Sequence, residues 1–172
     1  MRKSRLPSPG EVKVASLKRI DEERELLRRR MLLWDGGKTS RISLYDLTHK
    51  AQLILELEGL GWKGYNNIAV EPADWNRHCE ANLMTPAELY EALEKEHNAT
   101  IQNELKRMQE EILPRIERDP HQRTLYTCSG LHPFVIQYLI ETLKDSGWWV
   151  EFAPSTMAVD KQLIIRPKVM DR

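Results

Sequence analysis

The chain has 172 residues, of which 41% are hydrophobic, and its 26 basic and 26 acidic side chains give a net charge of zero. This length supports one hydrophobic core or two smaller ones, so the number of domains stays open. The balanced charge provides no protein-wide field that would attract nucleic acid or anionic lipid. No apolar stretch reaches the roughly 18 residues that cross a bilayer, and the first residues lack the apolar run of a signal peptide. We therefore expect a cytoplasmic protein, or a subunit of a particle assembled there, without a membrane partner.

The first nine residues are rich in basic side chains and contain two prolines. Proline cannot donate a backbone hydrogen bond and disfavours helix in the residue before it, so no helix is expected before Pro9. We predict an extended basic arm over residues 1–9. Together with a basic cluster near residue 30, the arm offers candidate phosphate contacts for nucleic acid. These candidates are Arg2, Lys3, Arg5, Arg28, Arg29 and Arg30.

Residues 10–119 are predicted to form a helical region, and its first helix runs from Gly10 to about Trp34, with Gly36 and Gly37 as the stop. This helix is amphipathic but rather polar. Because a helix gains most of its stability by packing its apolar face, we expect it to need a partner surface. Its apolar residues recur at helical spacing at Val14, Leu17, Ile20, Leu27 and Met31.

A second helix is predicted from Ser43 to Glu58, with Ser43 as the N-cap and Asp46 near the positive end of the helix dipole. Its apolar residues cover two flanks, which indicates a central place in the core. Residues 61–84 are the least periodic part of the chain, and only a short helix around Trp75 is expected there. The apolar positions of the second helix are Leu44, Leu47, Ala51, Leu53, Ile54, Leu57 and Leu60.

The clearest local signal is the run Thr85-Pro86-Ala87-Glu88, which is typical of a capping box with proline at the first helical position. We predict a long helix from about residue 86 to residue 113, which Pro114 bends or ends. Polar residues at 97–100 leave open a break into two helices. The apolar stripe is spaced mostly by fours, so a heptad seam is not established, but the stripe is a candidate oligomer interface. The interface candidates are Leu93, Ile101, Leu105, Met108 and Ile112.

Residues 120–172 change from helical to alternating periodicity and predict a small βαββ unit with a three-stranded sheet. The last strand could lie outside the other two or between them. If the first two strands are parallel, the helix crosses over on one sheet face, and the other face must be covered by the long helix or another subunit. The fold class is therefore α+β, with the N-terminal two-thirds mostly helical. The elements expected are strand Thr124–Cys128, helix Pro133–Ser146, and strands Trp148–Phe152 and Gln162–Pro167.

The pattern of this terminal unit resembles that of small tailed-bacteriophage proteins, several of which are virion components. The resemblance covers about a quarter of the chain and implies a structural or assembly role without any catalytic residue. It lies in the runs Ser129-Gly130-Leu131-His132-Pro133-Phe134-Val135-Ile136, Gly147-Trp148-Trp149-Val150 and Leu163-Ile164-Ile165-Arg166-Pro167.

The best catalytic candidate is the pair Cys128 and His132, which flanks a strand-to-helix turn. Amides at the N-terminus of the helix could lower the pKa of the thiol or hold an anion. No acidic partner for the histidine is identifiable, and cysteine is commonly a small buried hydrophobe. The two cysteines, Cys79 and Cys128, are too few for a disulfide framework. We therefore predict reduced thiols and no catalytic residue.

A second pattern, His78-Cys79-Glu80, spells half of a zinc-deaminase signature, but the second half with its two cysteines is missing. No glycine-rich phosphate loop or nucleophile elbow occurs. We therefore expect no metal site and no cofactor. His49 and His121 are expected at the surface or at helix ends, and His97 is expected to pair with a neighbouring side chain.

The charge is unevenly distributed, since residues 1–30 hold ten basic and five acidic residues, while residues 86–119 hold five basic and nine acidic ones. The two segments could pair between subunits or be ordinary solvated faces. We expect a non-enzymatic structural or assembly protein, acting as a homo-oligomer or as a subunit of a larger particle such as a virion. A nucleic-acid-binding accessory protein is the second hypothesis, and a cysteine-dependent or metal-dependent enzyme is the third.

Overall fold

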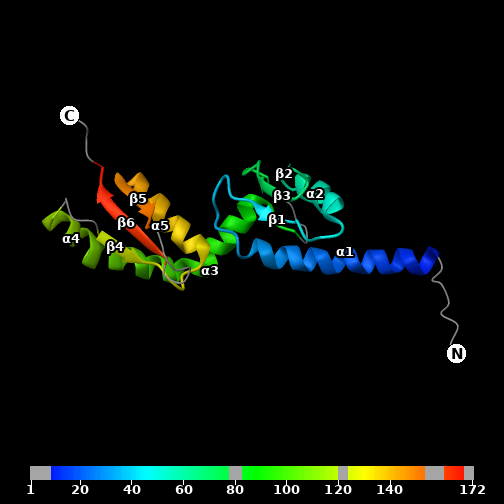
Figure 1. Cartoon of the computed structure of the whole chain (residues 1–172), viewed down its shortest axis with the longest axis horizontal. Helices are drawn as coiled ribbons and strands as arrows, with labels where there is room; N and C mark the ends of the chain where they lie inside the picture. Colours follow the sequence, from blue (N-terminus) through cyan, green and yellow to red (C-terminus); the bar gives the residue numbers. More distant parts are fainter. Residues whose placement is uncertain (1–8, 78–82, 120–123, 154–160, 169–172) are drawn as a thin grey trace, which may run out of the picture. The chain divides into compact units, whose positions relative to one another are not determined.

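A computed structural model describes residues 9–77, 83–119, 124–153 and 161–168. The described chain forms two compact units. The N-terminal unit comprises the described parts of residues 1–34 and 38–89, and the C-terminal unit comprises residues 35–37 and the described parts of 90–172. Each unit combines helices with one small three-stranded antiparallel sheet (Figure 1), so the fold class is α+β, as predicted.

The N-terminal unit contains a sheet that the sequence did not predict, so the expectation of a mostly helical N-terminal two-thirds holds only in part. The strand order is β1-β3-β2, and both neighbouring pairs are antiparallel. The second helix begins at Lys50 instead of Ser43, and residues 75–76 form a turn instead of a helix. The elements are α1 (Pro9–Met31), β1 (Ile42–Ser43), α2 (Lys50–Glu58), β2 (Trp62–Tyr65) and β3 (Ala69–Pro72).

The hairpin between β2 and β3 depends on the paired asparagines Asn66 and Asn67. Both have positive φ angles, 48° and 55°, and the amide of Ile68 donates to the carbonyl of Tyr65 at 3.1 Å. Two consecutive left-handed residues at the centre of the turn from Tyr65 to Ile68 are typical of a type I′ turn, whose twist matches that of the strands. The asparagines therefore specify the hairpin, although the flanking strands are too short and irregular to show a clear alternation.

A carboxylate from α1 completes the N-terminus of α2. The N-cap residue, His49, makes no side-chain capping bond. Instead, the nearly buried side chain of Glu23 accepts hydrogen bonds from the amides of Thr48 at 2.9 Å and His49 at 2.8 Å. Burial raises the pKa of Glu23, but these hydrogen bonds outweigh it and hold the pKa below its ordinary value. Glu23 thus binds the amide of the N-cap residue and the amide before it, and it joins α1 to α2, whereas Ser43 was expected to be the N-cap.

The C-terminal unit has the βαββ order that the sequence predicted, and its sheet order is β4-β6-β5. Both β4 and β5 pair antiparallel with β6, so the last strand lies between the first two. The strands β4 and β5 are therefore parallel to each other, with α5 as the connection. The elements are α3 (Pro86–Arg107), the π-helix η1 (Met108–Ile112), α4 (Leu113–Arg118), β4 (Thr124–Thr127), α5 (Pro133–Asp145), β5 (Trp148–Phe152) and β6 (Gln162–Pro167).

The long helix begins with the predicted capping box. The amide of Glu88 donates to the hydroxyl of Thr85 at 3.2 Å, and the amide of Thr85 donates to the carboxylate of Glu88 at 2.9 Å. The helix runs without a break through residues 97–100, continues as η1 up to Ile112, and passes through Pro114 as α4. Proline has no amide to donate to the preceding turn, and a wider π-turn accommodates this loss, so Pro114 does not end the helix.

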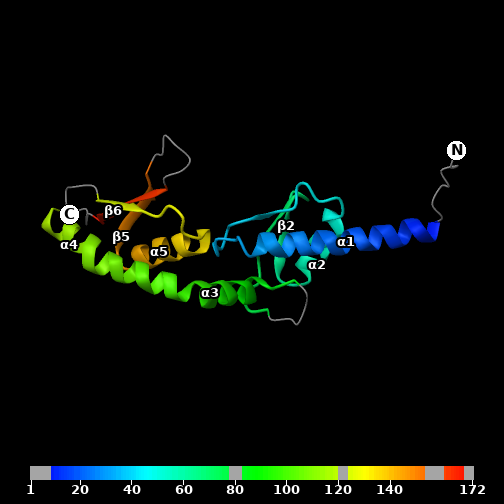
Figure 2. The same cartoon turned by 90° about the horizontal axis from the view of Figure 1, so that it is seen from below.

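Both α3 and α5 lie on one face of the C-terminal sheet (Figure 2). Tyr126 of β4 donates a hydrogen bond to Glu104 of α3, and Tyr90 of α3 packs edge-on against Phe134 of α5 with ring centroids 5.0 Å apart. The long helix therefore covers the same face as α5, which corrects the expectation that it would cover the other one. The shared face buries Tyr126, Val150, Leu163 and Ile165.

The apolar stripe of the long helix is covered within its own unit. Four of the five predicted interface residues are 0–4% exposed, and Leu105 is half-buried. This burial accounts for the stripe without a second copy of the chain, although no observation tests the predicted oligomer contact itself. The four buried residues are Leu93, Ile101, Met108 and Ile112.

Replacing Glu23 with glutamine should lower the free energy of unfolding by about 1–2 kcal/mol, because a neutral amide loses one acceptor and the charge that favours the helix N-terminus. Glu25→Gln on the same helix is the matched control. Glu25 is exposed and makes one 3.4 Å ion pair with Arg29, so its loss should cost less than about 0.5 kcal/mol. Urea denaturation of both variants measures the difference. Equal stabilities would show that Glu23 does not hold α2.

Candidate functional site

Helix α1 packs apolar side chains into the N-terminal unit with its second half, whereas in its first half Ser16 makes a 3.4 Å contact with His49. Ile20, Leu27 and Met31 are 5%, 0% and 1% exposed, and they lie with Glu23 on one face of the helix. In contrast, residues 11–19 are all exposed except the half-buried Ser16. Figure 1 shows this first half of α1 extending beyond α2 and the sheet of its unit. The chain thus presents more than two turns of helix with little cover of their own.

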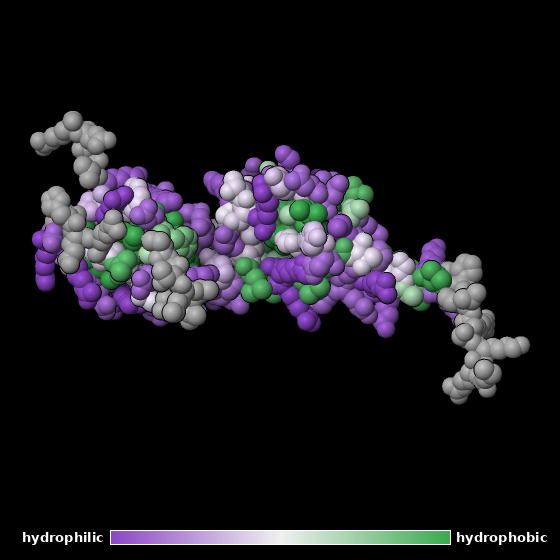
Figure 3. All heavy atoms as spheres, in the orientation of Figure 1, coloured by the Kyte–Doolittle hydropathy of each residue, from purple (hydrophilic) through white to green (hydrophobic). Residues whose placement is uncertain are grey.

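This projecting half carries large apolar side chains. Val12, Val14 and Leu17 are 53%, 67% and 53% exposed, although Val14 and Leu17 belong to the predicted apolar stripe of the helix. Figure 3 shows hydrophobic surface among polar side chains on this end of α1. A helical segment of this length is only marginally stable in water without packing. The core of the N-terminal unit therefore supplies the expected partner surface for the second half of α1, but not for the first half.

Two arginines fasten the second half of α1. Arg24 donates to both carboxylate oxygens of Glu56 at 2.9 and 2.6 Å and to Asp21 at 2.5 Å. Arg30 donates to both oxygens of Asp46 at 2.7 and 2.6 Å. The hydrogen bond from Arg24 lowers the pKa of Glu56. Both arginines therefore hold the second half of α1 to its own unit.

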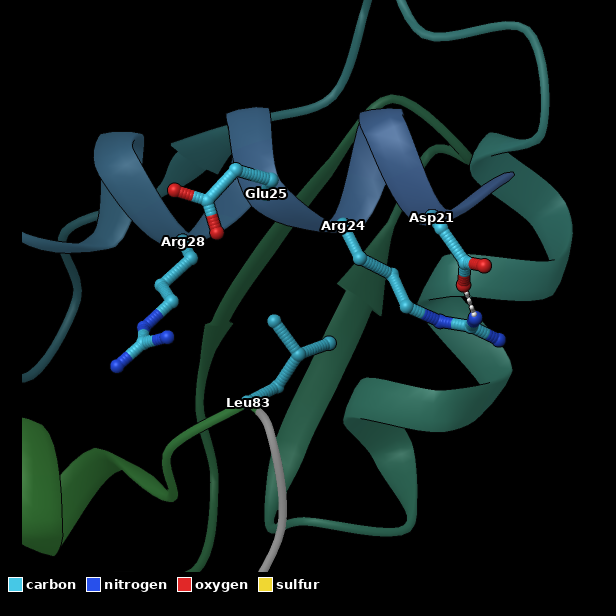
Figure 4. Close-up of a pocket in the computed structure, with 5 residues that line it drawn as sticks. All are labelled: Asp21, Arg24, Glu25, Arg28 and Leu83. Carbon is cyan, nitrogen blue, oxygen red and sulfur yellow. Dashed lines mark hydrogen bonds and ion pairs between the residues drawn. The ribbon is translucent and has the colours of Figure 1, made fainter. Parts of the chain in front are cut away.

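A groove of about 420 Å³ opens along the same part of α1, and its lining mixes both signs of charge. Figure 4 shows the side chains of Arg24 and Arg28 leaving α1 on either side of Leu83 in this view. Within the described ranges, Arg28 makes no ion pair. Since acids and bases alternate here, the groove does not favour a purely anionic ligand, and a partner with mixed charges fits it better. The lining residues are Asp21, Arg24, Glu25, Arg28 and Leu83.

The predicted nucleic-acid contacts are only partly described. Arg2, Lys3 and Arg5 lie outside the described residues. Arg28 and Arg29 are exposed, and Arg29 lies 3.4 Å from Glu25. The structure thus brings together on α1 only the cluster at 28–30, where Arg30 is already engaged by Asp46. Phosphate binding by these residues stays a prediction.

Cys128 is fully buried, and its thiol donates to the carbonyl of Lys161 at 3.2 Å. Burial raises the pKa of this thiol. A nucleophilic cysteine needs the opposite, a lowered pKa and an accessible sulfur. His132 serves as the N-cap of α5, since its Nδ1 accepts from the amide of Phe134 at 3.1 Å. Both side chains therefore have structural roles in the C-terminal unit.

Of the four remaining histidines, the structure describes His49 and His97. His97 stacks on His132 with ring centroids 4.3 Å apart, and His49 lies 3.3 Å from Glu23. The motif His78-Cys79-Glu80 and His121 lie outside the described residues. Among the residues that are described, no group of three or more metal-ligating side chains comes together.

The sequence-based reasoning missed two features of the N-terminal unit. One is the capping role of Glu23, which requires the spatial neighbourhood of α1 and α2 and leaves no local signal. The other is a tryptophan cluster in which Trp34 packs against Trp62 and Trp75 with centroid distances of 5.4 and 5.8 Å. The three residues are far apart in sequence, but their aromatic character within an otherwise polar region was an available hint.

Comparison with known proteins assigns no family. The sequence matches no protein-family model, and no curated protein or solved structure is significantly similar to it. Within the described ranges, no helix has the length and apolar character needed to cross a membrane. The geometry of α1 is therefore the main basis for a functional proposal.

We expect Cys128 to resist alkylation in the folded protein, because its sulfur is buried and its pKa is raised. Native protein treated with iodoacetamide near neutral pH should yield an unmodified Cys128 peptide by mass spectrometry. The same treatment in denaturant is the control and should modify it fully. Modification of the native protein at the rate of a free thiol would support a reactive site.

Proposed function

We propose that this chain is a non-enzymatic assembly protein that forms a homo-oligomer through the projecting half of α1. The observation that carries the proposal is the exposure of Val12, Val14 and Leu17 on a helical segment that its own unit leaves largely uncovered. Exposed apolar side chains gathered on one element are typical of protein interaction sites. A helix that extends beyond its own α+β unit is suited to joining neighbours in a larger particle, and the resemblance to virion components agrees with this role.

The C-terminal unit supports the same proposal because the apolar stripe of its long helix is already buried. Its long helix buries its apolar stripe against its own sheet and α5, so the oligomer contact is assigned to α1 instead of α3. The buried Cys128 and the N-cap role of His132 do not favour a nucleophile at this turn, so a cysteine-dependent or metal-dependent enzyme ranks third. Nucleic-acid binding ranks second, since Arg28 and Arg29 are exposed. Retardation of DNA or RNA by the intact protein at moderate salt would favour that second function.

The proposal predicts that the intact chain is a dimer or larger species whose mass depends on concentration. Light scattering after size-exclusion chromatography measures the mass. The triple variant Val12→Gln, Val14→Gln and Leu17→Gln should weaken association at least tenfold, because burying three aliphatic side chains supplies more than about 1.4 kcal/mol.

Leu55→Gln is the matched control, since Leu55 is 69% exposed on α2 of the same unit. This variant should associate like the intact protein. A monomeric intact chain at millimolar concentration would contradict the proposal. An oligomer unaffected by the triple variant would place the interface elsewhere.

A further inference from the structure

One face of α1 carries exposed residues at alternating spacings of three and four. Because a helix has 3.6 residues per turn, positions at this spacing line up along one side. This stripe, called here the α1 stripe, is exposed along its whole length. It combines aliphatic and charged residues in the order Val12, Ala15, Arg19, Glu22, Leu26 and Arg29.

The surface along the α1 stripe is hollowed at two places. A depression of about 310 Å³ near its N-terminal end is lined in part by Val12, Ala15 and Arg19. A second depression of about 460 Å³ near the other end is lined in part by Glu22, Leu26 and Arg29. Each depression shares three residues with the stripe and extends beyond it, the first toward Ser16 and His49 and the second toward Asp21 and Glu25.

The charges of the α1 stripe are complementary to the same stripe read in the opposite direction. In an antiparallel pair of α1 helices centred between Arg19 and Glu22, Arg19 of each copy lies opposite Glu22 of the other. Ala15 then lies opposite Leu26, and Arg29 lies level with Val12 and with Glu11, which is one residue before Val12. A two-fold axis forms each of these contacts twice. A parallel pair would instead place Arg19 against Arg19 and Glu22 against Glu22, which is unfavourable.

The chain itself leaves the central charges of the stripe available. Within the part of the chain that the structure describes, Arg19 and Glu22 take part in no ion pair. Two other arginines of α1 are engaged within the unit, because Arg24 binds Glu56 and Arg30 binds Asp46. The stripe therefore holds the acid and the base that a second copy can pair.

We propose that a second copy of this chain binds the α1 stripe, so that two α1 helices pack antiparallel with reciprocal Arg19 and Glu22 contacts. This inference rests on the proposed homo-oligomer and names its surface and register. In this arrangement, the projecting half of each helix lies along the second half of the other, which is anchored to its own unit. In the projecting half, the pairing covers Val12 and Ala15, whereas Val14 and Leu17 lie on other sides of the helix.

A charge swap tests the register directly by sedimentation equilibrium. Arg19→Glu alone and Glu22→Arg alone each place like charges together twice, so each should weaken the dimer at least tenfold. The double variant Arg19→Glu/Glu22→Arg restores opposite charges and should associate within threefold of the intact chain. Lys13→Glu makes the same charge change about 120° around the helix from Arg19 and should also stay within threefold.

Other results would overturn the inference. If the double variant is as weak as the single ones, or if the single ones match Lys13→Glu, then Arg19 and Glu22 do not pair between copies. An intact dimer that none of these variants affects would overturn this register and leave the proposed homo-oligomer standing. A monomeric intact chain would overturn both. Far-UV circular dichroism of each variant confirms that the exposed substitutions leave the fold intact.

Cross-linking tests the direction of the helices independently of charge. With Ala15→Cys and Leu26→Cys in one chain, mild oxidation should produce a covalent dimer in which peptide mapping finds a disulfide between positions 15 and 26. Ala15→Cys alone should give no bond between the two copies of position 15. A 15-to-15 disulfide would show parallel helices and overturn the proposal.

Discussion

The anchoring of α1 by Glu23 determines most of what the N-terminal unit presents to its surroundings. This carboxylate satisfies amides at the start of α2, and the hydrophobic residues that share its helix face enter the same core. Arg24 adds two bonds to Glu56 close by. All of these contacts begin at Ile20, so they fix the direction of the helix without covering its first half. The projection of residues 11–19 is a consequence of where the anchors lie.

The two units differ in how completely they bury their apolar residues. In the C-terminal unit, α3 and α5 cover one face of the sheet, and on the other face Ile164 is 4% exposed. The guanidinium of Arg166 lies 3.5 Å from the ring centroid of Trp149 on that same face, where Leu125 is 52% exposed. A three-stranded sheet with such a layer is well protected. Among the described residues, α1 carries more exposed large apolar side chains than any other element, namely Val12, Val14, Leu17 and Leu26, which is why that helix is the proposed site of assembly.

The sequence predicted the features that depend on local pattern, but not those that depend on contacts between residues far apart in the chain. The capping box at Thr85 and Glu88, the helix α5 and the strands β5 and β6 depend on local pattern, and they were predicted within one or two residues. The strand order was left open because it depends on contacts distant in sequence. The N-terminal sheet was missed because β1 has two residues and β2 and β3 have four each, too short for a clear alternation.

The candidate site on α1 was likewise predicted only as far as local sequence pattern allows. Helical periodicity correctly placed Val14 and Leu17 with Ile20 on a helix, but periodicity carries no information about where the supporting unit ends. Only the structure separates the buried Ile20 from the exposed Leu17 three residues earlier. Likewise, the cluster at 28–30 looked uniformly basic in the sequence, whereas Arg30 is neutralised by Asp46 sixteen residues later.

The most direct measurement of the central claim is amide hydrogen exchange of α1 as a function of protein concentration. Residues 21–31 should be protected at every concentration because their own unit anchors them. Residues 11–19 should exchange quickly in dilute protein and become at least tenfold slower as a second copy covers them. Rapid exchange of residues 11–19 at all concentrations would contradict the account, and so would strong protection that is independent of concentration.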